Sequence, residues 1–162
     1  LRTIAESLSM DALVEVHDAA ELEIALASGA TLIGVNNRNL HDFSVDLGTF
    51  GSLASHFCAG ITAVAESGIL SNADVKTVVD AGADAVIVSN HGGRQLDSVS
   101  STIAILPKIV EAVADRAVVL IDGGVHGGLA VGGRGQSQAV EGLDVPAGAA
   151  EFDGQPVEQL GV

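Results

Sequence analysis

The 162-residue sequence predicts an α/β fold of about five parallel βα units, followed by an irregular C-terminal tail. Two observations lead to this class. Short β-branched runs alternate with helical stretches, and a new run begins every ~20–30 residues, which is the length of a βα unit. The runs are also almost continuously apolar, as strands covered on both faces should be. Repeated units of this kind imply a parallel sheet with right-handed crossovers.

Five apolar, β-branched segments are predicted to form the strands. They are 12–16 (ALVEV), 31–35 (TLIGV), 62–66 (TAVAE), 84–89 (DAVIVS) and 117–121 (AVVLI). A parallel βα barrel carries its active site on the face where the carboxyl ends of the strands meet. The polar residues that close these segments are therefore the first candidates for functional side chains.

Four helices are predicted between the strands, at 19–29, 47–57, 72–82 and 100–115. Two pairs of residues have the spacing of a capping box, namely Asp18 with Glu21 and Ser71 with Asp74. Gly29 and Gly82 stand where a helix commonly ends in a left-handed residue. These local signals fix the ends of the first and third predicted helices.

The alternating pattern stops near residue 127. The segment 127–162 is rich in glycine, holds two of the three prolines and shows neither the helical nor the strand period. It is therefore predicted to be mostly irregular. We expect residues 1–126 to form one partial (βα)8 TIM-barrel domain and residues 127–162 to form a Gly-rich tail.

Charge and composition exclude several classes of protein. A net charge of −14 opposes binding to nucleic acid or to an anionic membrane, both of which need basic surface. No window of eighteen apolar residues is present, so no transmembrane helix is predicted. The single cysteine, Cys58, excludes an internal disulfide and fits a reducing cytoplasm. We expect a cytoplasmic protein without a metal site.

Polar residues follow the first three predicted strands. Glu15 lies between valines inside an apolar segment, so its side chain should point into a barrel interior, where a carboxylate can do acid–base work. His17, two residues on, is interpreted as a structural residue of the strand end. Asn36 and Arg38 close the second strand, and Glu66 closes the third. These side chains are predicted to share one face of the sheet.

Three motifs with these residues resemble one enzyme family. The motifs LVEVH (13–17), GVNNRNL (34–40) and AESGI (65–69) are similar to those of indole-3-glycerol-phosphate synthase, a lyase of tryptophan biosynthesis. The resemblance covers about residues 1–88, which match the second half of that family's (βα)8 barrel. It implies a reaction that closes an indole ring on an anthranilate-derived ribulose phosphate, with loss of carbon dioxide and water and without a cofactor.

The resemblance also implies roles for individual residues. Glu15 corresponds to the acid–base carboxylate of the family's fifth strand, and Asn36 and Arg38 to residues that contact the substrate. Glu66 is implied to lie beside the reacting centre. Ser67 and Gly68 are implied to border the substrate phosphate, which agrees with their place before a helix, where backbone amides can bind an anion.

The sequence lacks the lysines that this family uses in its active site. The family's glutamate and lysine of strand 1 and its general-acid lysine of strand 3 would lie before residue 1. The only lysines present are Lys76 and Lys108, both in predicted helices. We therefore expect the chain to be inactive as a lyase when it is isolated.

A second group of residues points to different chemistry. The segment VSNHGGRQLD (88–97) places His91 and Arg94 on a glycine turn, where an imidazole can act as a base and a guanidinium can hold a carboxylate. Residues 81–125 resemble FMN-dependent α-hydroxy-acid dehydrogenases and oxidases. The resemblance implies that His91 is the base and that Arg94 binds the substrate carboxylate. The residues implied to line the flavin phosphate are Asp122, Gly123 and Gly124.

Three functions follow from the sequence, in order of preference. The first is an indole-3-glycerol-phosphate synthase-like lyase that binds a small phosphorylated substrate. The second is a fragment of an FMN-dependent oxidoreductase, joined to the lyase segment near 81–86. That family's flavin-contacting lysine is replaced by Ser67, and its tyrosines have no counterpart. The third is a non-catalytic partial barrel that self-associates through its open edges.

Overall fold

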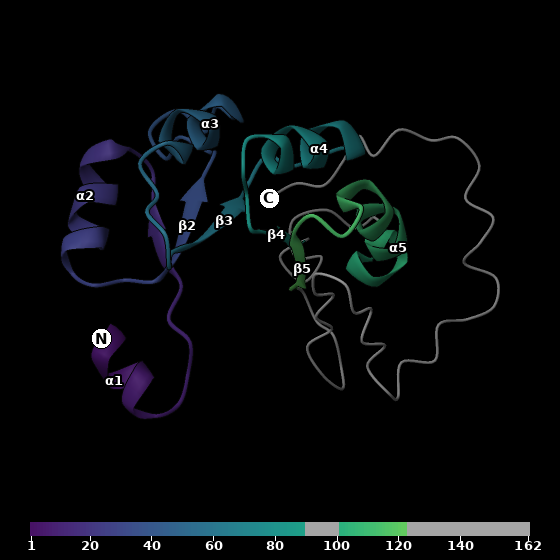
Figure 1. Ribbon diagram of the computed structural model, residues 1–162. Helices are drawn as coiled ribbons and strands as arrows, with labels where there is room; N and C mark the ends of the chain where they lie inside the picture. Colours follow the sequence, from purple (N-terminus) through teal and green to yellow (C-terminus); the bar gives the residue numbers. More distant parts are fainter. Residues whose placement is uncertain (90–100, 123–162) are drawn as a thin grey trace.

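The computed structural model describes residues 1–89 and 101–122, which form one parallel sheet with helices along it (Figure 1). The sheet has five strands in the order β1-β2-β3-β4-β5, the same order as in the chain. The strands are β1 (Val14–Val16), β2 (Leu32–Asn36), β3 (Thr62–Glu66), β4 (Ala85–Val88) and β5 (Val118–Ile121). Every neighbouring pair is parallel, which confirms the α/β class and the five predicted strands. The tail predicted over 127–162 lies outside the described residues.

Five helices are present in the part of the chain that the structure describes. They are α1 (Arg2–Ser7), α2 (Ala19–Ala27), α3 (Gly48–Ala54), α4 (Asn72–Asp80) and α5 (Thr102–Val113). Figure 1 shows α2, α3, α4 and α5 following one another along the sheet in chain order, while α1 stands apart before β1. Each of these four helices follows one strand and precedes the next in the chain, as repeated βα units require.

The helix ends form as the capping signals predict. The Asp18 carboxylate accepts a hydrogen bond from the Glu21 amide at 2.8 Å, and the Ser71 hydroxyl accepts one from the Asp74 amide at 3.2 Å. Gly29 follows α2 with φ +79°. Gly82 follows α4 with φ +106°, so both glycines adopt the left-handed conformation that glycine tolerates best.

The main core lies between the sheet and its helices. The largest fully buried side chains include Ile33 and Val35 of β2, Phe50 of α3, and Ile109 of α5. Because successive strand residues point to opposite faces, Val16 is buried in this core while its neighbour Glu15 points to the other face. The strand ends on that other face carry the polar residues of interest.

The described strands form an open sheet, with β1 and β5 at its two edges. The face that a complete barrel would enclose is therefore accessible to water at the β1 edge, where 46% of the Glu15 side chain is exposed. This exposure differs from the interior position expected for Glu15, and its physical cause is that no strand lies beyond β1 among the described residues.

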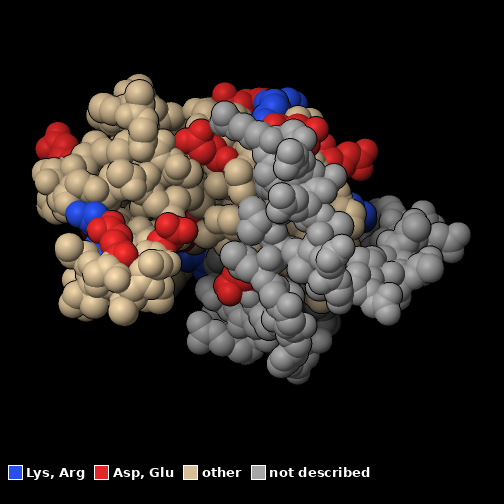
Figure 2. Space-filling model, turned by 60° about the horizontal axis from the view of Figure 1, so that its bottom comes forward, with Lys and Arg blue, Asp and Glu red and all other residues tan. Residues whose placement is uncertain are grey.

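The described surface is mainly acidic or uncharged. In the view of Figure 2, acidic side chains (red) form several separate patches, and lysine and arginine (blue) form smaller areas. This distribution accords with the net charge of −14. No helix in the described ranges is long and apolar enough to cross a membrane.

Candidate active site

Three predicted site residues lie at the carboxyl ends of adjacent strands. In the register of the sheet, Glu15 of β1 is paired with Gly34 of β2, and Asn36 of β2 is paired with Glu66 of β3. Alternation along each strand then puts Glu15, Asn36 and Glu66 on the same face. The structure thus brings together polar side chains that are far apart in the sequence.

Glu15 makes direct contacts with two of its neighbours. Its Oε1 atom accepts a hydrogen bond from Asn36 Nδ2 at 2.9 Å and lies 3.1 Å from His17 Nε2. The other ring nitrogen of His17, Nδ1, lies 3.0 Å from Glu21 Oε2. A carboxylate, an amide and an imidazole therefore meet at the end of β1.

Glu66 lies over Gly34, which has no side chain to occupy that space. A Cβ atom built on Gly34 would lie 1.6 Å from Glu66 Oε1. The carboxyl group is half-buried, and Oε1 has no hydrogen-bond partner within the described residues. Burial first, and then the charge of Glu15, raises the pKa of Glu66 from 4.5 to about 7, while His17 acts in the opposite direction. Glu66 can therefore exchange a proton near neutral pH.

Arg38 follows Asn36 in the loop after β2. Its backbone amide donates a hydrogen bond to Asn36 Oδ1 at 2.9 Å, and its backbone forms an isolated antiparallel bridge to Val45. The Nε atom is buried and has no hydrogen-bond partner in the ranges described. Asn36 and Arg38, with His17, line a cleft of about 570 Å³. A cleft of this size can hold a small-molecule ligand.

Asn37 is a buried residue that the sequence did not single out as important for the site. Its side-chain nitrogen donates to the Glu66 carbonyl at 2.8 Å, and its Oδ1 accepts from the Phe50 amide at 3.1 Å. These bonds tie the loop after β2 to the end of β3 and to α3. Asn37 therefore supports the backbone beside Asn36 and Glu66. The only sequence signal was its position at a strand end.

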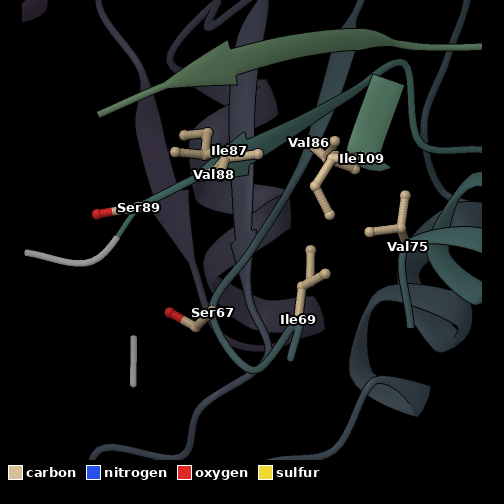
Figure 3. Close-up of a pocket in the computed structure, with 8 residues that line it drawn as sticks. All are labelled: Ser67, Ile69, Val75, Val86, Ile87, Val88, Ser89 and Ile109. Carbon is tan, nitrogen blue, oxygen red and sulfur yellow. The ribbon is translucent and has the colours of Figure 1, made fainter. Parts of the chain in front are cut away.

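Ser67 and Gly68 form a left-handed turn after β3, with φ values of +60° and +70°. Ser67 also lines a small pocket with Ser89, and Figure 3 shows both hydroxyl groups pointing the same way, away from Ile69 and Val75. The pocket has a volume of about 10 Å³, room for about one water molecule. This pocket is too small for a phosphate group, so a phosphate bound at Ser67 would have to lie outside it.

Among the described residues, Asp122 does not join the Glu15 cluster. Asp122 follows β5, at the opposite edge of the sheet, and accepts a hydrogen bond from Ser89 Oγ at 2.8 Å. The remaining predictions lie outside the described residues; they concern His91, Arg94, Gly123 and Gly124. Among the residues described, no group of three or more His, Cys, Asp or Glu side chains is arranged to hold a metal ion.

Comparison with known sequences gives one family. A family model described as "Indole-3-glycerol phosphate synthase" matches residues 1–103. The chain is 50% identical over 95 residues to the indole-3-glycerol phosphate synthase of Chlorobium phaeovibrioides, covering 59% of this chain and 36% of that protein. It is 51% identical over 87 residues to that of Chloroherpeton thalassium, covering 54% and 34%. The chain thus spans about a third of the length of these relatives.

Comparison with solved structures gives the fold. A mandelate oxidase variant with a monooxide FMN adduct has a TM-score of 0.60 and 27% identity, over 78% of this chain and 45% of that chain. A mandelate oxidase variant with benzaldehyde has a TM-score of 0.59 and 25% identity, over 76% and 45%. The likeness reflects a shared barrel fold. It does not support the fused FMN-enzyme segment expected over 81–125.

The family match itself bears on the proposed join near 81–86. The match continues to residue 103, through the first half of the stretch that resembles FMN enzymes. The likeness to mandelate oxidase is one of fold, and a shared βα unit accounts for similar residues at this point. By its match over residues 1–103, the chain belongs to the indole-3-glycerol phosphate synthase family of carboxy-lyases.

Proposed function

We propose that this chain supplies the second-half strand ends of an indole-3-glycerol phosphate synthase active site. The reaction closes an indole ring on an anthranilate-derived ribulose phosphate, with loss of carbon dioxide and water. The observation that carries the proposal is the cluster of Glu15, Asn36 and Glu66 on one face of the sheet. Active sites of parallel βα barrels form at such strand ends.

The two carboxylates suit proton transfer because their surroundings differ. Glu15 is exposed and accepts a hydrogen bond from Asn36, whereas Glu66 is half-buried with a pKa of about 7. Carboxyl groups held in unlike environments can take different acid–base roles at one pH. In this proposal Glu15 is the acid–base carboxylate, and Glu66 lies beside the reacting centre.

The remaining residues of the cluster suit an anionic substrate. Arg38 has a buried nitrogen that hydrogen-bonds to no side chain or backbone group within the described part of the chain, and it lines the cleft with Asn36. A guanidinium in this position can bind a carboxylate through paired hydrogen bonds. Ser67 and Gly68 are proposed to border the substrate phosphate. The reaction needs no cofactor.

Activity is proposed for a complete barrel and not for this chain alone. The chain covers about a third of its relatives, and its two lysines lie in α4 and α5, away from the strand ends. A positioned general acid typically contributes about 100- to 10,000-fold to rate. We expect no measurable turnover from the isolated chain.

The test is complementation in solution. The chain is mixed with a separately expressed front half that carries strands 1–4 of a family member, and closure of the indole ring is followed by fluorescence of the product. Turnover should appear in the mixture and fall by about 100-fold or more with Glu15→Gln. Glu23→Gln, an exposed carboxylate on α2, is the matched control and should leave turnover unchanged. Full turnover with Glu15→Gln, or turnover by the chain alone, would contradict the proposal.

The two alternative functions have less support. The FMN alternative depends on His91 and Arg94, which lie outside the described residues, and on a likeness of fold to mandelate oxidase. The self-associating fragment depends on the open edges at β1 and β5. Within the described residues, the side chains brought together at the strand ends are Glu15, Asn36 and Glu66.

A further inference from the structure

His17 connects the end of β1 to the first turn of α2 through both of its ring nitrogens. Nδ1 lies 3.0 Å from Glu21 Oε2, and Nε2 lies 3.1 Å from Glu15 Oε1. The His17 backbone amide also donates to Glu21 Oε2, at 2.8 Å. The imidazole is thus held between two carboxylates, one on the helix and one at the strand end.

Glu21 is itself fixed, so it can orient the ring. It lies in the first turn of α2, and its amide is capped by the Asp18 carboxylate at 2.8 Å. A carboxylate can only accept a hydrogen bond, so Nδ1 must carry the proton in this contact. Glu21, a residue of α2, therefore sets the direction of the ring and points Nε2 at Glu15.

The contact between Nε2 and Glu15 has a chemical consequence. Nε2 has no hydrogen-bond partner in the described part of the chain, so its 3.1 Å approach to Glu15 is a charge contact that attracts the carboxylate when the imidazole is protonated. The same Oε1 atom accepts a hydrogen bond from Asn36 Nδ2 at 2.9 Å, so both His17 and Asn36 contact it.

From this geometry we infer that His17 is a positioning residue that holds the Glu15 carboxylate in hydrogen-bonding reach of Asn36. The assignment of Glu15 as the acid–base group rests on the function proposed above, but the positioning itself does not. The charge of His17 also acts on Glu66, because it lowers the Glu66 pKa, which burial and Glu15 raise. One imidazole thus acts on both carboxylates of the cluster.

The test uses nuclear magnetic resonance on the full chain, without substrate. Two signals are followed in the wild type and in His17→Gln: the Asn36 side-chain amide and the Glu66 carboxyl carbon during a pH titration. We expect the Asn36 signal to shift as Glu15 moves away. The Glu66 midpoint should rise by roughly 0.2 to 0.7 pH unit, the size expected for an exposed ion pair.

Two further variants separate positioning from a role in the helix alone. Glu21→Gln keeps the shape of the cap and should shift both signals in the same direction by a smaller amount. His41→Gln removes an exposed imidazole from the loop after β2 and should leave both unchanged. A residue that only caps α2 would change the melting temperature and leave both signals in place, which would overturn the inference. Because no turnover is measured, this result is independent of the lyase proposal.

Discussion

Gly34 shows how a single residue without a side chain shapes the site. Glu66 occupies the space that a Cβ atom at Gly34 would need, 1.6 Å from Oε1 and 2.7 Å from the carboxyl carbon. The clash involves the end of a flexible side chain, so a larger residue would move Glu66 and leave the sheet in place. The half-buried state of Glu66, and with it the raised pKa, therefore depends on Gly34.

We predict that Gly34→Ala displaces the Glu66 carboxyl group toward water. Its pKa should fall from about 7 toward 4.5, while the free energy of unfolding changes by less than about 1 kcal/mol. A titration followed by carboxyl-carbon resonance measures the first effect and urea unfolding the second. Gly51→Ala is the control, because a Cβ there meets no atom within 4 Å. A Glu66 midpoint that stays near 7 in Gly34→Ala would contradict this account.

Glu66 should also make stability depend on pH. Its pKa is raised on folding, so the folded chain holds the proton more tightly than the unfolded chain between pH 4.5 and about 7. The contribution of Glu66 to stability is then fully present below pH 4.5 and is lost as pH rises to about 7. We predict that Glu66→Gln stabilises the chain at pH 8 by about 1 kcal/mol, after allowance for solvent screening, and has little effect at pH 4. Urea midpoints at the two pH values measure this; an equal gain at both would rule out titration as the cause.

At the residue scale the sequence offered candidate side chains but did not predict their contacts. Glu15, Asn36 and Glu66 could be picked out because each is a polar residue at the end of an apolar run. Their contacts depend on the strand register, which sets Glu15 beside Gly34 and is a property of paired strands. For the same reason the sequence did not predict the contact of His17 with Glu15 or the hydrogen bonds of Asn37 to Glu66 and Phe50.

Helices α2 and α4 begin with side-chain caps. The Ser71 hydroxyl accepts a hydrogen bond from the Asp74 amide. The Asp74 carboxylate in turn accepts a hydrogen bond from the Leu70 amide at 3.0 Å. Asp18 and Glu21 repeat this pattern, with the Glu21 carboxylate accepting from the His17 amide. In both cases the acidic residue reaches one residue further back than in an ordinary capping box.

We predict that Ser71→Ala lowers the free energy of unfolding by about 1 kcal/mol, since α4 loses its N-cap. Thr77→Ala in the same helix is the control. Thr77 is exposed and bonds only its own helix at the Ala73 carbonyl, so its removal should be neutral or slightly stabilising. Urea unfolding of both variants provides the measurement, and an equal loss in the two would show that the cap has no special role.

At the scale of helices and strands, the boundaries predicted from the sequence lie close to those in the structure. All five strands were predicted within two residues of their observed ends, because continuous apolar runs define them. The helix predicted over 47–57 is shorter, Gly48–Ala54, since no capping or left-handed residue marks its end. The pattern of residues did not assign α1, which buries no residue and so lacks an apolar stripe.

The whole molecule is an open sheet with two free edges in its described part. Strands β1 and β5 each have one neighbour among the described strands, and Leu13 beside β1 is exposed. Unpaired strand edges invite pairing with another chain. The sequence predicted this openness from the number of strands, but it could not predict which side chains would become exposed along it.

We predict that the isolated chain self-associates. Light scattering after size-exclusion chromatography should give a mass larger than one chain, because a second chain can cover the edge of β1 or β5. Addition of the front half used for complementation should convert the associated form into a one-to-one complex. A stable monomer at low micromolar concentration would contradict the prediction.

We also predict weak or absent FMN binding. The sequence lacks the lysine implied for flavin contact, which Ser67 replaces, and each lost charge-assisted hydrogen bond costs about 1.5–3 kcal/mol. Affinity should therefore be poorer than micromolar. Quenching of flavin fluorescence on titration provides the measurement, and sub-micromolar binding would revive the oxidoreductase alternative.

The strand order has a consequence for how the chain folds. Because β1 to β5 pair in chain order, each of β2 to β5 finds its partner in the strand that precedes it, about one βα unit earlier. The segments between paired strands hold 15, 25, 18 and 29 residues, and because the entropic cost of closing a loop grows only with the logarithm of its length, that cost differs among them by about 0.6 kcal/mol or less. Within the described sheet, pairing can then proceed one strand at a time in the order of synthesis.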